Sequence, residues 1–264
     1  MGNWSNKNQN KIKAQQHVEE CNRLYSDDIK QCIEESRVYN FGNGRNLPDF
    51  KIKKPVNTEI ILDDTDSVSA IYNCNPEEIV SVLNFASYKN PGGKFIEGAM
   101  AQEEALCHES ILYNVLSNQR FQNEFYEPNH SRLNKAIYND NLIYSKDVLF
   151  IDSVSGNTYA DVITCAAPNY GVATEICKVK PERVLIHMKS RIKHVLYSAL
   201  DNNVDVVILG AYGCGVFKND PYKVAQIFKE ELETTFKGAF EKVIFAIPNK
   251  GSKNYKAFKE VLFD

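Results

Sequence analysis

Residues 206–221, VVILGAYGCGVFKNDP, pass from an apolar run through a glycine-bearing loop into the start of a helix. Val206–Leu209 is apolar at consecutive positions, as expected for a strand that is covered on both faces. Gly210, Gly213 and Gly215 follow, and the closing Asn-Asp-Pro is typical of a helix N-terminus. A strand that leads through a tight loop into a helix is the repeating unit of α/β folds.

The same alternation recurs along most of the chain. Apolar runs predict strands at residues 58–62, 79–85, 148–151, 162–166, 204–209 and 243–247. Helices are predicted at residues 103–116, 181–202, 221–236 and 253–262. Residues 9–38 have bulky side chains at helical spacing on both sides of Ser26–Asp28, which predicts two helices. Residues 39–56 are predicted to form a connecting loop, and the polar residues 118–141 a long excursion from the core. We expect a helical N-terminal extension over residues 1–56 and a three-layer α/β/α core with a mixed, largely parallel sheet over residues 57–264.

Composition sets broad limits on partners and location. The 264 residues are 43% hydrophobic and 25% charged, and the net charge of −3 attracts neither nucleic acid nor anionic membranes. The seven cysteines are scattered and form no C-x-x-C pair, which disfavours a zinc site and favours reduced thiols. The first residues lack the apolar segment of a signal peptide. We therefore expect a cytoplasmic protein that binds neither membranes nor nucleic acid directly. Separately, we expect a monomer.

A second glycine loop follows another predicted strand. Residues 84–107 read NFASYKNPGGKFIEGAMAQEEALC, so the strand at residues 79–85 leads into Asn90-Pro91-Gly92-Gly93. Glycine allows backbone N–H groups to approach a phosphate closely. Because ligands of open α/β sheets bind beyond the carboxyl ends of the strands, two such loops at one edge predict a site for a diphosphate. Neither loop has the spacing of a P-loop or a dinucleotide-binding fingerprint.

Two adjacent carboxylates follow this loop at the start of a predicted helix. Glu103 and Glu104 should diverge by about 100° around the helix axis, so they cannot flank one bond as the two acids of an ordinary glycosidase do. One can face the cleft as an acid or base while the other holds a sugar hydroxyl or points elsewhere. The alternative is that both only compensate the helix dipole.

Three segments, NFASYKNPGGKFIEGAMAQEE, ITCAAPNYG and GAYGCGVFKNDP, together resemble the bacterial-type poly(ADP-ribose) glycohydrolases, a branch of the macrodomain superfamily. The resemblance spans almost the whole chain and implies a macrodomain-like core behind a helical N-terminal segment. The family signature is a Gly-Gly-Gly loop, a short spacer and Gln-Glu-Glu. The matching residues are Gly92, Gly93, Gln102, Glu103 and Glu104, and Lys94 replaces the third glycine.

The resemblance also implies roles for individual residues. The two loops would hold the diphosphate of ADP-ribose, Glu104 would be the catalytic carboxylate, and Glu103 would position ribose hydroxyls. No metal or other cofactor is implied. The implied substrate-binding residues are Asn84, Asn90, Gly92, Gly93, Lys94, Gln102, Gly213, Gly215, Val216 and Phe217.

Several of these residues have alternative interpretations. Lys94 either holds the backbone farther from the ligand or adds a charge to the diphosphate. Phe217 either orients the distal ribose or anchors the helix that follows it. Asn90 is equally plausible as a turn residue before Pro91. His108, one turn beyond Glu104, either faces the same groove or is structural.

The implied activity is hydrolysis of poly(ADP-ribose) from the chain terminus, with release of ADP-ribose. One alternative is hydrolysis of mono-ADP-ribose from a modified molecule. Another is a non-catalytic ADP-ribose reader, against which the pair Glu103 and Glu104 argues, because a pure binding module gains little from two carboxylates beside an anion.

Overall fold

The computed structural model describes residues 2–42 and 47–264, and over these residues seven strands form one mixed sheet. The strands are β1 (Arg37–Asn40), β2 (Glu59–Asp63), β3 (Val80–Phe85), β4 (Asn141–Phe150), β5 (Thr158–Cys165), β6 (Val206–Leu209) and β7 (Lys242–Ala246). Their order across the sheet is β1-β4-β5-β3-β6-β7-β2. The strands from β5 to β2 run parallel, and β4 is antiparallel to both β1 and β5.

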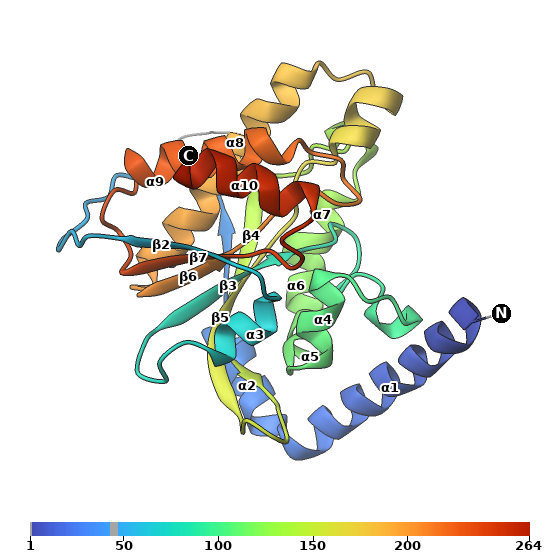
Figure 1. Ribbon diagram of the computed structural model, residues 1–264. Helices are drawn as coiled ribbons and strands as arrows, with labels where there is room; N and C mark the ends of the chain where they lie inside the picture. The colour runs from blue at the N-terminus through green and yellow to red at the C-terminus, as the bar shows by residue number, and fades with distance from the viewer. Residues whose placement is uncertain (1, 43–46) are drawn as a thin grey trace.

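Helices cover both faces of this sheet (Figure 1). The helices of the described residues are α1 (Gly2–Leu24), α2 (Ser26–Glu35), α3 (Ser67–Tyr72), α4 (Gln102–His108), α5 (Leu112–Leu116), α6 (Gln119–Phe121), α7 (Glu127–Asn129), α8 (Pro181–Asp201), α9 (Pro221–Glu233) and α10 (Lys253–Phe263). Short turns of 3-10 or π geometry are η1 (Phe95–Glu97), η2 (Gln122–Tyr126), η3 (Arg132–Asn134) and η4 (Val172–Ile176). The three-layer α/β fold predicted from the sequence is confirmed.

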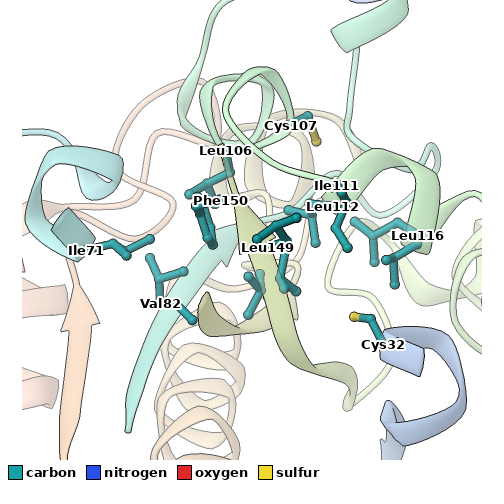
Figure 2. Close-up of a cluster of buried hydrophobic side chains, with 14 of the residues drawn as sticks. Cys32, Ile71, Val82, Leu106, Cys107, Ile111, Leu112, Leu116, Leu149 and Phe150 are labelled. Carbon is teal, nitrogen blue, oxygen red and sulfur yellow. The ribbon is translucent and has the colours of Figure 1, made fainter. Parts of the chain in front are cut away.

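Neighbouring residues of the central strands enter opposite cores. Val82 of β3 packs in the core beneath α3, α4 and α5, whereas Leu83 packs in the core beneath α8, α9 and α10. Figure 2 shows part of the first core, in which Val82 lies near Ile71 of α3 and Phe150 of β4. Because each central strand is buried on both sides, it needs apolar residues at consecutive positions, which is the pattern that the sequence has.

Each of the six predicted strands overlaps a strand of the sheet, but the edge strand β1 was not predicted. Residues 37 and 38 were assigned to a helix and residues 39 and 40 to a loop, and both assignments are wrong. Arg37 pairs with Tyr144, and Asn40 with Asn141, across an antiparallel ladder. Four residues are too short to show an alternating pattern, and their partners lie a hundred residues away. The remainder of the predicted loop includes Gly44, which lies outside the described residues. The division of the chain between residues 56 and 57 stays a prediction.

The single helix predicted at residues 103–116 is instead two helices, α4 and α5. The backbone leaves the helix at Glu109, whose carbonyl accepts the N–H of Ile151, and the Ile111 N–H donates to the Leu149 carbonyl at 3.1 Å. Ser110 thereby forms a bridge to Phe150 at the end of β4. This pairing with a distant strand ends the first helix, and the local pattern of apolar residues gives no sign of it.

The N-terminal helix α1 runs along the same side of the molecule as α4 and α5 (Figure 1). His17 Nε2 lies 2.9 Å from the Ser110 carbonyl. Gly98 has a φ of +82°, and a Cβ at this position would overlap the Lys7 carbonyl of α1. The extension therefore packs directly against the segment that carries the first glycine loop. No helix in the described ranges is both long and apolar enough to cross a membrane.

Candidate active site

A cleft of about 770 Å³ lies at the carboxyl ends of the central strands. Its walls come from the segments that follow β3 and β6, from the first turn of α4, and from the residues that follow β5 and β7. The structure brings together ten residues singled out from the sequence: Asn90, Gly93, Lys94, Gln102, Glu103, Glu104, Gly213, Gly215, Val216 and Phe217. Asn84 and Gly92 do not line this cleft.

The two glycines of the first loop face different surroundings. Both have a φ of +61°, a conformation that side chains with a Cβ rarely adopt. A Cβ on Gly93 would stand 2.6 Å from Glu104 Oε1 and 2.9 Å from Glu103 Oε2. A Cβ on Gly92 would instead meet the side chains of Tyr113 and Cys107 in the interior. Gly93 therefore borders the carboxylates, and Gly92 packs on the core behind them.

Glu103 is buried and held from two sides. Its Oε2 accepts the backbone N–H of Ser87 at 2.6 Å, and its Oε1 lies 3.4 Å from Nδ2 of Asn84. Asn84 is itself buried and also donates to Oγ1 of Thr164 on β5 at 3.2 Å. Burial raises the pKa of Glu103 to about 8; the nearby charge of Glu104 adds to this rise, and the Ser87 N–H opposes it.

Glu104 connects the first glycine loop to helix α4. Its Oε1 accepts the backbone N–H of Lys94 at 2.9 Å, and its Oε2 accepts that of Ala101 at 3.0 Å. The second bond caps α4, because the N–H of Ala101 precedes the first helical turn. Dipole compensation, considered for both acids in the sequence, is therefore only part of what Glu104 does: it also fixes the position of Lys94.

Gln102 completes the attachment of this helix to β3. Its Oε1 accepts the N–H of Phe85 at 2.8 Å, and its Nε2 donates to the Leu83 carbonyl and to Ser67 Oγ. Gln102, Glu103 and Glu104 thus each bond a different part of the surrounding backbone.

The two glutamates converge although their Cα positions diverge around the helix. Glu104 bends back toward the N-cap, Glu103 reaches toward the segment after β3, and both line the cleft beside Gly93. The interpretation in which one of them points elsewhere is wrong. The length of the side chains compensates for the divergence at the helix axis: Glu103 reaches the N–H of Ser87, and Glu104 reaches that of Lys94.

Gly213 and Gly215 of the second loop differ in what surrounds them. Gly213 has a φ of +71°, and a Cβ there would stand 2.7 Å from Ala167 Cβ and 2.8 Å from Asn219 Nδ2. A Cβ on Gly215 would have no described atom within 4 Å, its chain neighbours aside. The protein itself therefore requires glycine at position 213 but not at position 215.

Beyond these glycines the loop exposes two apolar side chains at the cleft. Val216 is 87% exposed, whereas Phe217 is half-buried and packs against the core beneath α8 and α9. Phe217 both borders the cleft and anchors the segment before α9, so the two roles considered for it from the sequence are compatible.

Lys94, in place of the third glycine of the family, has ordinary backbone geometry. Its φ is −113°, which any residue adopts, and its N–H makes the bond to Glu104. Within the described ranges its exposed side chain forms no ion pair, and it borders the cleft. The conformation at this position does not require glycine.

Asn90 borders the cleft, whereas His108 lies away from it. Asn90 forms part of the turn, since its carbonyl accepts the Gly93 N–H at 3.0 Å, and it also borders the cleft. His108 does not line the cleft and packs edge-on against Phe95, with ring centres 4.6 Å apart. The structural interpretation of His108 fits this position.

Several residues of the cleft were not predicted from the sequence. They include Asp66 and Ser67 at the start of α3, Tyr88 after β3, Tyr212 after β6, and Ile247, Pro248 and Asn254 after β7. All lie just beyond the end of a strand or at the start of a helix. Their position after a parallel strand is the signal that could have identified them. The same rule applies to the segments after β2 and β7 as well as to those after β3 and β6.

Known proteins with the same architecture align with most of this chain. Residues 6–153 match the family model of the microbial-type PARG catalytic domain, where PARG stands for poly(ADP-ribose) glycohydrolase. The T267R mutant of PARG from Deinococcus radiodurans, solved with ADP-ribose, is 31% identical, with 89% of this chain and 97% of that chain covered and a TM-score of 0.79.

A second solved relative is PARG from Thermomonospora curvata, which is 28% identical over 96% of this chain and 99% of that chain, with a TM-score of 0.81. The same protein was also solved with the inhibitor ADP-HPD, and that structure has a TM-score of 0.80 at 28% identity over the same shares of the two chains. The search of curated proteins returned no match. The family model covers more than half of the chain, and the chain therefore belongs to the microbial-type PARG catalytic domain family.

Proposed function

We propose that the protein is a poly(ADP-ribose) glycohydrolase that releases ADP-ribose by hydrolysing ribose glycosidic bonds, acting from the chain terminus. One observation carries the proposal: two buried carboxylates converge beside Gly93 in a cleft between two glycine loops. Membership of the microbial-type PARG family gives this arrangement its chemical meaning.

The proposed ligand, ADP-ribose, has parts that fit different walls of the cleft. A volume of about 770 Å³ is within the usual range for small-molecule sites. The loop at Gly215 leaves open space beside its backbone, which allows a phosphate oxygen to approach N–H groups closely. The diphosphate would lie here, and the distal ribose would extend past Phe217 toward the glutamates.

The raised pKa of Glu103 explains how two carboxylates can lie beside an anionic ligand. With a pKa of about 8, Glu103 is mostly protonated and neutral at pH 7. Such a group repels a diphosphate less than a carboxylate would, and its hydroxyl can donate a hydrogen bond to a ribose oxygen. This supports the role of Glu103 in positioning the ribose.

Glu104 is proposed as the catalytic acid and base. In its protonated form it would donate its proton to the ribose oxygen that leaves, while the bond from that oxygen to the anomeric carbon breaks and an oxocarbenium-like ribose forms. Water then adds to the anomeric carbon, and its proton passes to Glu104. The two backbone N–H groups that hold Glu104 fix its carboxyl group beside Gly93, so the acid is in place before substrate binds.

Hydrolysis of mono-ADP-ribose from a modified molecule remains the alternative, because the same cleft and carboxylates would serve it. The preference for the polymer, the monomeric state and the cytoplasmic location stay predictions.

The test is to incubate the purified protein with automodified poly(ADP-ribose) and, separately, with a mono-ADP-ribosylated protein, and to measure free ADP-ribose. We expect release from the polymer. Release only from the mono-modified substrate would support the alternative, and tight ADP-ribose binding without release from either would identify a reader.

A further inference from the structure

Tyr138 lies outside the cleft lining but contacts two aromatic residues that form it. Its buried ring stacks on that of Tyr88, with centroids 3.8 Å apart and planes inclined by 19°. On another side, the ring of Phe217 lies at a centroid distance of 6.3 Å. Tyr88 follows β3 and Phe217 follows β6, and both line the cleft. Tyr138 is thus a common support behind one side chain from each of the two loop regions.

The backbone around Tyr138 has an unusual conformation. Lys135, Ala136 and Tyr138 have φ values of +51°, +61° and +66°. Each such residue costs on the order of 1–3 kcal/mol and persists only where its surroundings impose it. A segment that needed only to connect η3 to β4 would have no reason to keep three of them.

A fully buried arginine holds this segment in place. Nη2 of Arg191, on α8, donates to the carbonyls of Ile137 and Tyr138 at 3.1 and 3.2 Å. Nη1 donates to the Ala166 carbonyl, just after β5, and Nε pairs with Asp140 at 2.9 Å. The guanidinium therefore ties the segment that carries Tyr138 to the end of a central strand.

The same segment is joined to the second glycine loop. The Asn169 N–H donates to the Ala136 carbonyl at 2.9 Å, and the Gly171 N–H donates to the Phe217 carbonyl at 3.1 Å. Asn219 Nδ2 donates to the carbonyls of Pro168 and Gly213 at 2.9 Å each. Phe217 is thus held through its backbone by residues 168–171 and faces Tyr138 with its ring.

We propose that Tyr138 is a positioning residue that acts through Phe217 and Tyr88. The inference rests on the proposed function: it assigns to a buried residue the task of fixing the aromatic wall against which the distal ribose lies. Because a displacement of a reacting centre by about 1 Å lowers the rate on the order of a hundredfold, this support should affect turnover more than binding.

The test compares Tyr138→Leu with Tyr138→Phe on automodified poly(ADP-ribose). Tyr138→Leu should lower kcat by about tenfold to a hundredfold and should change the Kd for ADP-ribose by less than about threefold. Tyr138→Phe keeps the ring and should restore kcat to within about twofold of wild type. Should the leucine variant fail to fold, Tyr138→Met, which fills irregular space with an unbranched chain, takes its place.

Phe50→Ala is the matched control, because Phe50 also stacks on a core ring, Phe236, at 5.4 Å, and does not line the cleft. It should lower thermal stability but leave kcat per folded molecule unchanged. In the Phe217→Ala background, Tyr138→Leu should lower kcat by a smaller factor than in the wild-type background, since the part of its effect that passes through Phe217 is already lost.

Two results would overturn the inference: an unchanged kcat in the folded leucine variant, or losses that add fully with those of Phe217→Ala. These differ from failure of the proposed function, in which the wild-type protein itself would release no ADP-ribose.

Discussion

The two glycine loops of the cleft are constructed in opposite ways. In the first, Gly93 lies against the oxygens of Glu103 and Glu104, and each carboxylate already accepts backbone N–H groups of the protein. In the second, Gly215 borders open space and Val216 is 87% exposed. The first loop is therefore assembled by the protein before any ligand binds, whereas the second leaves open space beside the backbone of Gly215. The fold needs glycine at position 93, and we propose that the ligand needs it at position 215.

The largest effect that this comparison predicts is on catalysis by Glu104→Gln. Loss of the titratable proton should lower the rate of ADP-ribose release by roughly a hundred- to ten-thousandfold. The structure adds a second effect. Both Glu104 oxygens accept backbone N–H groups, but glutamine offers one acceptor and one NH₂, so either Lys94 or Ala101 loses its partner.

An unsatisfied, partly buried donor should lower the free energy of unfolding of this variant by up to about 1–3 kcal/mol in urea titrations. Glu109→Gln, an exposed substitution just after α4, is the control and should change neither the rate of ADP-ribose release nor the free energy of unfolding. Equal stabilities of the two variants would mean that Glu104 does not fix the first loop.

Gly93→Ala should be the next most damaging change, because it combines an unfavourable φ with overlap of both carboxylates. The left-handed conformation alone costs about 1–2 kcal/mol for a residue with a Cβ. Gly156→Ala provides the matched control, since Gly156 has a φ of +84° but no described atom within 4 Å of the added Cβ, its chain neighbours aside. We expect Gly93→Ala to lose more unfolding free energy than the control and also to lose hydrolysis. Equal losses of unfolding free energy in Gly93→Ala and Gly156→Ala would show that the two carboxylates can move aside at no energetic cost.

Glu103→Gln should change how stability depends on pH. Burial raises the pKa of Glu103 from 4.5 to about 8, so in this range the folded protein holds a proton that the unfolded chain has released. Wild-type stability therefore falls as pH rises from about 4.5 to about 8, and the contribution is constant above this range. The variant lacks this contribution, so its unfolding free energy should rise relative to wild type between pH 5 and pH 8.

Asn84 can adapt to this substitution: rotation of its amide turns an oxygen toward the new NH₂ and toward the Thr164 hydroxyl. Glu103→Gln should consequently be tolerated better than Glu104→Gln at neutral pH. A constant difference from wild type across the pH range, measured by urea unfolding, would contradict a protonated Glu103.

Lys94→Gly should have the smallest effect. The Lys94 side chain is exposed at the edge of the cleft, and an exposed charge contributes little to binding. If it attracts the diphosphate, removing it should weaken ADP-ribose binding by no more than about fivefold at low salt and hardly at all at high salt. Calorimetry at the two salt concentrations distinguishes this from a backbone effect, which would weaken binding equally at both.

Local sequence patterns were sufficient for the features that local physics determines. The strands β3 and β6 are apolar at consecutive positions because they are buried on both faces, and Asp220 and Pro221 start α9 as expected. The location of the cleft followed from the rule that ligands bind beyond the carboxyl ends of parallel strands.

Features set by distant contacts could not be predicted. The sequence does not distinguish Gly92, which packs on Tyr113, from Gly93, which borders the carboxylates. The pairing of Tyr88 with Tyr138, and the bonds from Arg191 to the same segment, join positions about 50 residues apart or more along the chain. Such contacts depend on how the sheet is ordered, and the order of its strands is not written in any local pattern.

The most direct test of the contrast between the loops measures Glu104→Gln and Gly215→Val side by side, with ADP-ribose calorimetry and with hydrolysis of poly(ADP-ribose). Glu104→Gln should lose hydrolysis and retain ADP-ribose binding. Gly215→Val, whose side chain meets open space in the protein, should keep wild-type stability and lose at least about tenfold in affinity, because it fills space meant for the ligand. Undiminished hydrolysis by Glu104→Gln, or wild-type affinity in Gly215→Val, would contradict this account.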